Sequence, residues 1–139
     1  MSLYILDTDI LTLLQDSDPL VIRNVVNHAA DDLAVTVISV EEQLSGWYTQ
    51  LRRVKGRDAL ARVYERLAEN VEILAGTAIL KFTTSAIVRY ENLKALKLNV
   101  GKNDLRIAAV TLEHGGILVT RNLRDFQRIP NLIVENWAV

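Results

Sequence analysis

The sequence predicts a single α/β domain, a three-layer α/β/α sandwich in which helices cover both faces of a central parallel sheet. Short apolar runs rich in β-branched residues alternate with segments whose apolar residues recur at helical spacing. A strand, a helix and a further strand in succession form a right-handed crossover between parallel strands. No linker, repeat or low-complexity stretch divides the 139 residues, so residues 1–139 are expected to form one domain.

The first predicted strand, residues 4–6, is short and apolar, and it ends in the acidic triplet Asp7-Thr8-Asp9. Residues 10–14 continue at helical spacing, so a helix begins at the triplet, capped by Thr8 or Asp9. In open α/β sheets, ligands bind outside the carboxyl ends of the strands. Asp7 is therefore not needed as a cap and is a candidate ligand for a positively charged group.

The next elements extend to the middle of the chain. Asp18 and Pro19 open a helix through residue 30, and residues 33–38 are expected to form a strand buried on both faces. Ser39 and Glu42 match a capping box at the start of another helix. A basic turn over residues 52–57 then leads into a helix with Leu60, Val63, Tyr64 and Leu67 on one face.

The second half of the chain shows the same alternation. We predict a short strand over residues 71–74, a long helix from Thr77, and a loop over residues 99–102. A helix from Asn103 is ended by Gly115 and Gly116. A strand over residues 117–120, a turn-rich connection over 121–129 and a last strand over 132–135 complete the chain.

Composition excludes several functional classes. The absence of cysteine excludes disulfides, thiolate zinc sites and a cysteine nucleophile. A net charge of −1 makes general electrostatic attraction to nucleic acid weak, so such binding requires a local basic patch. No apolar run is long enough to span a bilayer and no signal peptide is recognisable, which leads us to expect a cytoplasmic protein without membrane contact.

Four carboxylates follow predicted strands or open helices near them: Asp7, Glu42, Asp104 and Asp125. In a parallel sheet these positions gather at one edge. Three of the four have a structural alternative, because Glu42 completes a capping box, Asp104 starts a helix and Asp125 suits a turn. Taken together, however, clustered carboxylates either raise their pKa values or hold a divalent cation. Ligands that are all oxygens favour Mg²⁺ or Mn²⁺, which suits phosphodiester hydrolysis.

Four segments carry a resemblance to a known family: residues 6–9, 40–46, 103–109 and 120–126. In this order and at these spacings they closely resemble PIN-domain ribonucleases, in particular the VapC toxins of bacterial toxin–antitoxin pairs. The ending from Ile129 to Trp137 also fits that group. The resemblance implies in-line attack of water on an RNA phosphodiester, with transfer RNA as the expected substrate class.

The resemblance also implies roles for individual residues. Asp7, Glu42 and Asp104 would bind the metal ion, and Thr120 would form a hydrogen bond near them. The family often has a fourth acid where this chain has Asn122, so Asp125 is expected to replace that charge or the second metal is held weakly. Asp9 stands where many relatives have asparagine.

Three kinds of partner are implied besides RNA. Such toxins typically form homodimers, and a cognate VapB-like antitoxin blocks them by placing its C-terminal segment in a groove beside the active site. The antitoxin's N-terminal part binds operator DNA, so this chain would contact DNA only indirectly. Trp47, Tyr48 and Leu51 are candidates for the antitoxin groove or a dimer contact, although core packing is an equal alternative for one of them.

Basic side chains offer candidate contacts to the RNA backbone. Arg121, Arg124 and Arg128 flank the expected site and are the better candidates. Arg52 and Arg53 belong to a denser basic run, for which a solvated helix end is the commoner explanation.

Two other functions fit part of the pattern. Asp7 and Asp9 imitate the nucleophile and acid of haloacid-dehalogenase-type phosphatases, but the strand ending at Thr120 is followed by Arg121 and Asn122 in place of an acidic pair. A non-catalytic PIN-like module that binds without cutting is favoured only by Asn122. The retained acids at positions 7, 42 and 104 argue against that module.

Overall fold

The computed structural model describes residues 2–139, and its centre is a parallel sheet of five short strands. The strands are β1 (Tyr4–Leu6), β2 (Leu33–Thr36), β3 (Ala78–Leu80), β4 (Ile117–Val119) and β5 (Ile133–Glu135). Their order in the sheet is β3-β2-β1-β4-β5, and every neighbouring pair is parallel. The carboxyl ends of all five strands therefore share one edge. Because β1 is the central strand, Asp7 leaves the sheet at its middle.

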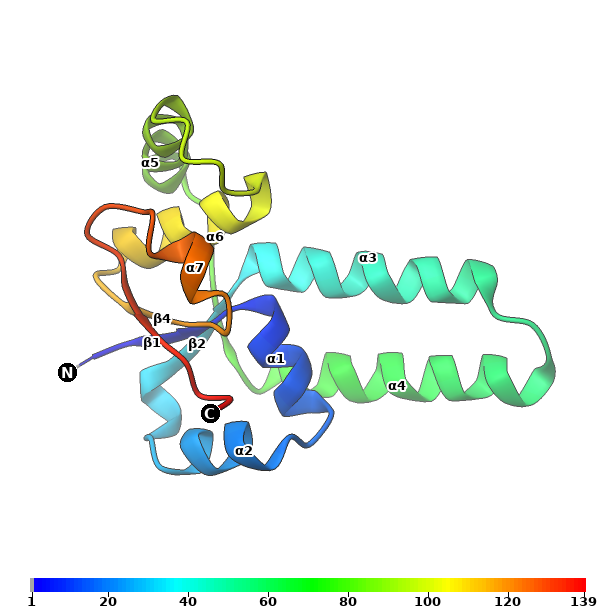
Figure 1. Cartoon of the computed structure of the whole chain (residues 1–139). Helices are drawn as coiled ribbons and strands as arrows, with labels where there is room; N and C mark the ends of the chain where they lie inside the picture. The colour runs from blue at the N-terminus through cyan, green and yellow to red at the C-terminus, as the bar shows by residue number, and fades with distance from the viewer. Residues whose placement is uncertain (1) are drawn as a thin grey trace.

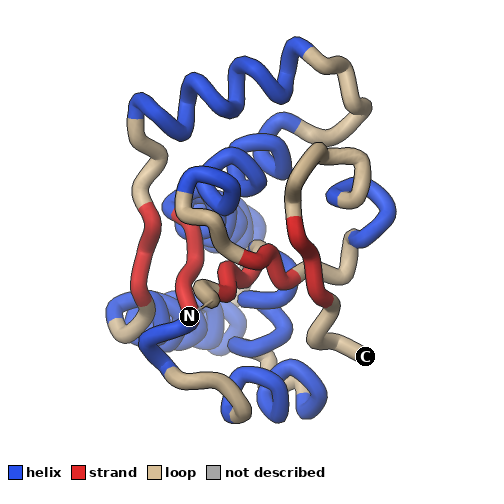
Figure 2. The backbone as a smooth tube through the Cα atoms, turned by 90° about the vertical axis from the view of Figure 1, so that its left-hand side faces the viewer, coloured by secondary structure: helices blue, strands red, loops and turns tan. Residues whose placement is uncertain are grey.

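Helices lie on both sides of the sheet, which confirms the predicted three-layer α/β/α architecture (Figures 1 and 2). They are α1 (Thr8–Gln15), α2 (Pro19–Val26), the 3₁₀ turn η1 (Ala30–Asp32), α3 (Val37–Arg53), α4 (Arg57–Ala75), α5 (Thr84–Ala95), α6 (Lys102–Glu113) and α7 (Leu123–Phe126). No helix within residues 2–139 is long and apolar enough to cross a membrane.

Successive strand residues point to opposite faces of the sheet and so build two cores. Ile5 and Leu118 pack on one side with residues of α5, α6 and α7, whereas Leu6 and Val119 pack on the other with residues of α1 and α2. All four side chains are almost completely buried. This burial on both faces explains why β1 and β4 are continuous apolar runs without polar alternation.

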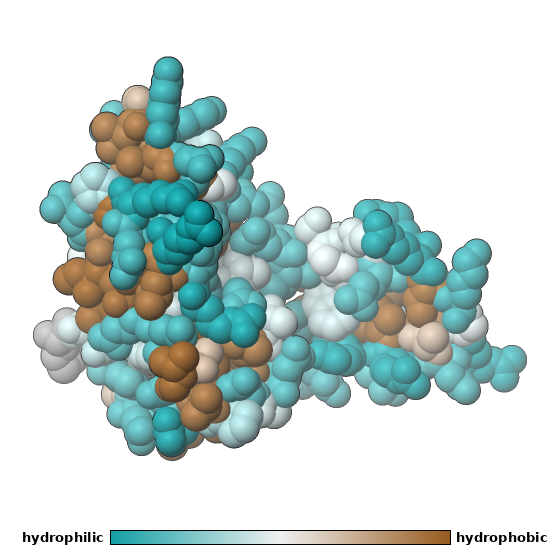
Figure 3. All heavy atoms as spheres, in the orientation of Figure 1, coloured by the Kyte–Doolittle hydropathy of each residue, from teal (hydrophilic) through white to brown (hydrophobic). Residues whose placement is uncertain are grey.

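Helices α3 and α4 run side by side and project from the body of the protein as an arm (Figure 1). Hydrophobic atoms are visible on this arm between the hydrophilic ones (Figure 3). The arm begins at the sheet edge, since α3 follows β2 directly and α4 returns the chain to β3. Residues near the start of α3 thus lie near the strand ends, and Arg52 and Arg53 lie at the far end of the arm.

The predicted strand over residues 71–74 is wrong, and the predicted start of the next helix at Thr77 is wrong, although the helix itself is present as α5. Residues 71–74 lie in the last turn of α4, and the third strand is β3, which occupies the start of the segment assigned to the helix. β3 is a three-residue edge strand with Ile79 41% exposed, so it carries little of the continuous apolar signal of a buried strand. The helix begins only at Thr84, with the hydroxyl of Thr83 accepting from the backbone N–H of Ala86.

Other predicted elements are present with different limits. Asp18 caps α2 as expected, but α2 ends at Val26, before the predicted residue 30. β2 ends at Thr36, so the last residues of the strand predicted over 33–38 belong to α3. The helix predicted to end at the Gly115-Gly116 pair is α6, which ends at Glu113, and the connection over residues 121–129 contains the short helix α7.

Candidate active site

Asp7 directly follows β1 and is the N-cap of α1. Its Oδ1 accepts a hydrogen bond from the backbone N–H of Ile10 at 2.8 Å, and only 6% of the residue is exposed. The prediction that Thr8 or Asp9 caps this helix is therefore wrong. β1 passes into α1 without a loop, so the last extended residue is the only one in a position to cap.

Although Asp7 caps α1, its ionised form is destabilised by burial. Burial raises the pKa of Asp7 to about 6 from its ordinary value of 3.8, although hydrogen bonds from the Thr120 side chain and the Ile10 backbone oppose this rise. The negative charges of Asp9 and Asp104 raise the pKa further. Thr120, which is fully buried, thus lies where the family resemblance implied, beside Asp7.

Glu42 does not cap a helix. Helix α3 begins at Val37 and is capped by Thr36, whose hydroxyl accepts from the backbone N–H of Ser39 at 3.2 Å. The predicted Ser39–Glu42 capping box is therefore absent, and the structural alternative for Glu42 falls with it. Its carboxylate instead extends from α3 toward the neighbouring helices.

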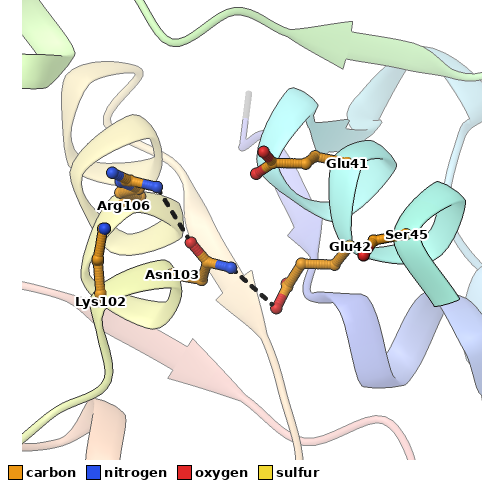
Figure 4. A pocket seen from close by; sticks show the side chains of 6 residues that line it. All are labelled: Glu41, Glu42, Ser45, Lys102, Asn103 and Arg106. Carbon is orange, nitrogen blue, oxygen red and sulfur yellow. Dashed lines mark hydrogen bonds between the residues drawn. The ribbon is translucent and has the colours of Figure 1, made fainter. Parts of the chain in front are cut away.

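Two side chains from other helices fix the Glu42 carboxylate. Thr8 at the start of α1 donates to Oε1 at 2.6 Å, and Asn103 at the start of α6 donates to Oε2 at 3.3 Å (Figure 4). The same figure shows Arg106 donating to Asn103, a contact of 3.3 Å. Sequence analysis missed Thr8, Asn103 and Arg106 as site residues. Their only signal in the sequence was adjacency. Thr8 follows Asp7, Asn103 precedes Asp104, and Arg106 lies one helical turn after Asn103.

Asp104 lies in the first turn of α6, which has no side-chain cap. Its pKa is raised by burial and then by the charges of Glu42 and Asp125. Because Asp104 also raises the pKa of Asp7, all four predicted carboxylates belong to one electrostatically coupled group. Within residues 2–139, however, no three carboxylates lie close enough together to form a ready-made metal cage.

Asp125 is held by its own helix. Asn122 caps α7 through its Oδ1 and donates from Nδ2 to Asp125 Oδ2 at 3.0 Å. Arg128 contacts the other carboxylate oxygen at 3.4 Å. Both oxygens of Asp125 therefore have partners, and its charge reaches Asp104 while it stays bound to Asn122 and Arg128.

This pairing predicts unequal effects for the two α7 residues. Asp125→Asn removes a charge from the coupled group and is expected to lower RNA cleavage about tenfold. Asn122→Ala keeps that charge and frees one Asp125 oxygen, so we expect a smaller change. Cleavage rates measured for both variants and for the double variant test this expectation. An Asn122→Ala loss equal to or greater than that of Asp125→Asn would contradict it.

Asp9 and Arg121 form a two-pronged ion pair at the rim. Arg121 donates from Nε and a terminal nitrogen to the two Asp9 oxygens at 2.6 and 2.9 Å. Arg128 also donates to the backbone carbonyl of Asn99 at 2.9 Å. Two of the three arginines predicted to contact RNA near the site are therefore already paired with carboxylates. Arg124 is exposed in α7.

The structure separates the two aromatic residues of α3. Trp47 is half-buried in the cleft between α1, α3 and α4, with the guanidinium of Arg66 5.6 Å from its ring centre. Tyr48 is 51% exposed and borders an apolar surface with Val37, Val40 and Leu44. Leu51, one turn further along, is half-buried. The three residues were predicted together as candidates for one contact surface, but Trp47 and Tyr48 line different surfaces.

Comparison with known proteins identifies the family. A model of the PIN domain matches residues 4–132. The chain belongs to the PIN-domain family. Ribonuclease VapC2 of Haemophilus influenzae is 32% identical to this PIN domain over 140 residues, covering 97% of this chain and 98% of the relative. The tRNA(fMet)-specific endonuclease VapC of Salmonella typhimurium is 25% identical over 139 residues, covering 97% and 98%.

A solved structure shows the same architecture. The VapBC2 complex of Rickettsia felis, bound to a DNA fragment from its promoter, contains a chain with a TM-score of 0.79 and 27% identity to this PIN domain. The match covers 97% of this chain and 98% of that one. The phosphatase alternative is thereby contradicted, and this PIN domain belongs with the VapC ribonucleases.

Proposed function

We propose that this PIN domain is a Mg²⁺- or Mn²⁺-dependent endoribonuclease and the toxin of a toxin–antitoxin pair. The observation that carries the proposal is the coupled group of Asp7, Glu42, Asp104 and Asp125 at the carboxyl edge of the sheet. Ribonuclease activity follows from membership among the VapC ribonucleases. The proposal adds the metal ion, the class of RNA and the partners.

The donor set suits a hard divalent cation. Asp7, Glu42 and Asp104 offer only oxygen ligands, and a cation would relieve the repulsion and burial that raise the pKa values of Asp7 and Asp104. Glu42 would have to turn from Thr8 and Asn103 toward the aspartates, a movement that one long side chain can make. Such an ion activates water and neutralises charge that builds on a phosphate.

The chain's own residues then have distinct tasks. Thr120 and the Ile10 backbone hold the Asp7 carboxylate in place, so this side chain would need little movement to bind a divalent cation. Thr8 and Asn103 hold Glu42 near the same edge before a cation binds, and Glu42 leaves them when it turns toward the aspartates. Because Asp7 is almost completely buried, little water screens its charge, and its interaction with a cation is correspondingly strong.

Transfer RNA is the proposed substrate class, because one relative that covers nearly the whole chain is a tRNA(fMet)-specific endonuclease. A VapB-like antitoxin is the proposed inhibitor, since the solved relative is a VapBC complex. In that complex a promoter DNA fragment is bound, so we propose that DNA reaches this chain only through its antitoxin. The apolar surface around Tyr48 is the proposed contact for the antitoxin or for a second copy of the chain.

Metal-dependent cleavage of RNA tests the proposal. The purified chain is expected to cut transfer RNA in Mn²⁺ or Mg²⁺, to lose all cleavage in EDTA and to regain it when metal is restored. Products should be mapped at their ends by sequencing. Cleavage that persists in EDTA would contradict the metal requirement. Manganese binding with RNA left intact would instead support the non-catalytic module.

A further inference from the structure

A cavity of about 600 Å³ opens beside Glu42, between α3 and α6. The residues that line it are Glu41, Glu42, Ser45, Lys102, Asn103 and Arg106 (Figure 4). Its two walls carry opposite charges, because the glutamates come from α3 and the cations come from α6. A negatively charged ligand in this cavity would therefore lie against α6.

Arg106 is held in one position on its wall. Its guanidinium carbon lies 5.9 Å from the ring centre of Phe82 and 5.3 Å from that of Tyr90, and the rings pack edge to face. A terminal nitrogen donates to Asn103 at 3.3 Å. The Nε atom is buried without a hydrogen-bond partner among the described residues. The guanidinium is thus pre-organised and incompletely hydrogen-bonded.

Arg106 and Lys102 also differ from the arginines on the other side of the site. Arg121 and Arg128 are paired with Asp9 and Asp125. Within residues 2–139, no ion pair involves Lys102 or Arg106. A phosphate that contacts Arg121 or Arg128 must compete with a carboxylate, but one that enters the cavity meets two unpaired cations.

We propose that Lys102 and Arg106 bind a phosphodiester of the RNA next to the one that is cut. This inference rests on the proposed ribonuclease function and identifies a backbone-binding subsite for it. A guanidinium forms charge-assisted hydrogen bonds to phosphate from its terminal nitrogens, and an exposed lysine adds a mobile charge. The carboxylates of Glu41 and Glu42 repel the RNA from the opposite wall, so its backbone follows α6 toward Asp104.

The subsite is connected to the catalytic carboxylates through Asn103. This side chain accepts from Arg106 and donates to Glu42, so it links the bound phosphate to the orientation of the glutamate. Asn103 is a positioning residue in this arrangement, whereas Lys102 and Arg106 contact the substrate.

Binding of a short fluorescent single-stranded RNA in EDTA tests the subsite separately from cleavage. Arg106→Gln and Lys102→Gln are each expected to weaken binding, Arg106→Gln about tenfold. The slope of log K against log salt concentration should become shallower by about 0.7 for each lost phosphate contact. Arg23→Gln removes the same charge from α2, a different helix outside the cavity lining, and is expected to leave the slope unchanged.

The variants also separate contact from folding and from catalysis. Lys102 is exposed, so Lys102→Gln keeps the inference testable even if Arg106→Gln fails to fold. Asn103→Ala should lower kcat in Mn²⁺ by a larger factor than it weakens RNA binding, because it frees Glu42 while Lys102 and Arg106 keep their charges. If Arg106→Gln and Lys102→Gln both bind RNA like Arg23→Gln, the subsite is wrong, although metal-dependent cleavage would still stand. If wild-type protein binds RNA through these residues but never cuts it, the proposed ribonuclease function fails, and Lys102 and Arg106 remain only as an RNA-backbone binding site.

Discussion

Asp7→Asn is expected to abolish RNA cleavage and, in the absence of metal, to make the protein more stable at neutral pH. The two effects have one cause, because the ionised carboxylate that would bind the metal is almost completely buried. Asparagine retains a side-chain oxygen that caps α1 through the Ile10 N–H, so the helix start is preserved. What disappears is a desolvated negative charge.

The pH dependence gives the direction of the stability change. The folded pKa of Asp7 is raised to about 6 from 3.8, so the folded protein binds this proton more tightly than the unfolded chain. The stability that this proton contributes is complete below pH 3.8 and is lost as the pH rises through 6. Above that window the ionised carboxylate costs up to about 3 kcal/mol, at roughly 1.4 kcal/mol per pKa unit. Asp7→Asn removes this cost.

Thermal or urea unfolding in EDTA between pH 4 and pH 8 measures the effect. Wild type is expected to lose stability across about pH 4 to 6, while Asp7→Asn lacks this component and is more stable above it. Asp18→Asn is the matched control, because Asp18 also caps a helix but is half-exposed. Its loss should slightly destabilise α2 through the helix dipole. An Asp7→Asn variant less stable than wild type at pH 7.5 would contradict the buried-charge account.

The sequence predicted the layers and the sheet because their causes are local. β1 and β4 are apolar runs buried on both faces, and such runs can be recognised without knowing their neighbours. β3 could not be found in this way. It is a short edge strand whose place depends on pairing with β2, and its partly exposed Ile79 falls at helical spacing with residues of the following helix.

The exact residues that cap α1 and α3 could not be predicted from the sequence. Several capping residues stand together at positions 7–9 and again at positions 36–39, and sequence alone does not reveal which one ends the extended backbone. At both places the first candidate, Asp7 or Thr36, forms the cap. Because Thr36 caps α3, Glu42 is free of any capping role, and its carboxylate accepts hydrogen bonds from Thr8 and Asn103.

The four carboxylates could be predicted as a group because parallel strands share one carboxyl edge. Their individual partners could not, because those depend on the angles between α1, α3 and α6. The contact of Thr8 with Glu42 and the stacking of Arg106 on Tyr90 join residues far apart in the chain. The same dependence explains why Arg121 was predicted to contact RNA although it is paired with Asp9.

The second large effect is expected at Asp104, the carboxylate that connects the others. Glu42 and Asp125 raise its pKa, and its own charge raises that of Asp7. Asp104→Asn should therefore reduce cleavage by more than about 100-fold, because even the loss of an outer hydrogen bond to a metal ligand costs 10- to 100-fold. The variant should also lower the pKa of Asp7 toward its ordinary value, since one of the charges that raise it is gone.

Metal binding to Asp104→Asn separates this role from a structural one. Saturating Mn²⁺ is expected to raise the unfolding temperature of wild type, with a stabilisation of about 2.7 kcal/mol at 100 times Kd, and to leave that of Asp104→Asn unchanged. Asp58→Asn is the matched control, because Asp58 is also an acid in a first helical turn, but on α4 of the projecting arm. Asp58→Asn should retain both cleavage and the manganese shift. A manganese shift of wild-type size in Asp104→Asn would show that the cation is held elsewhere, because a group that binds it at this edge of the sheet cannot lose its central charge without losing affinity.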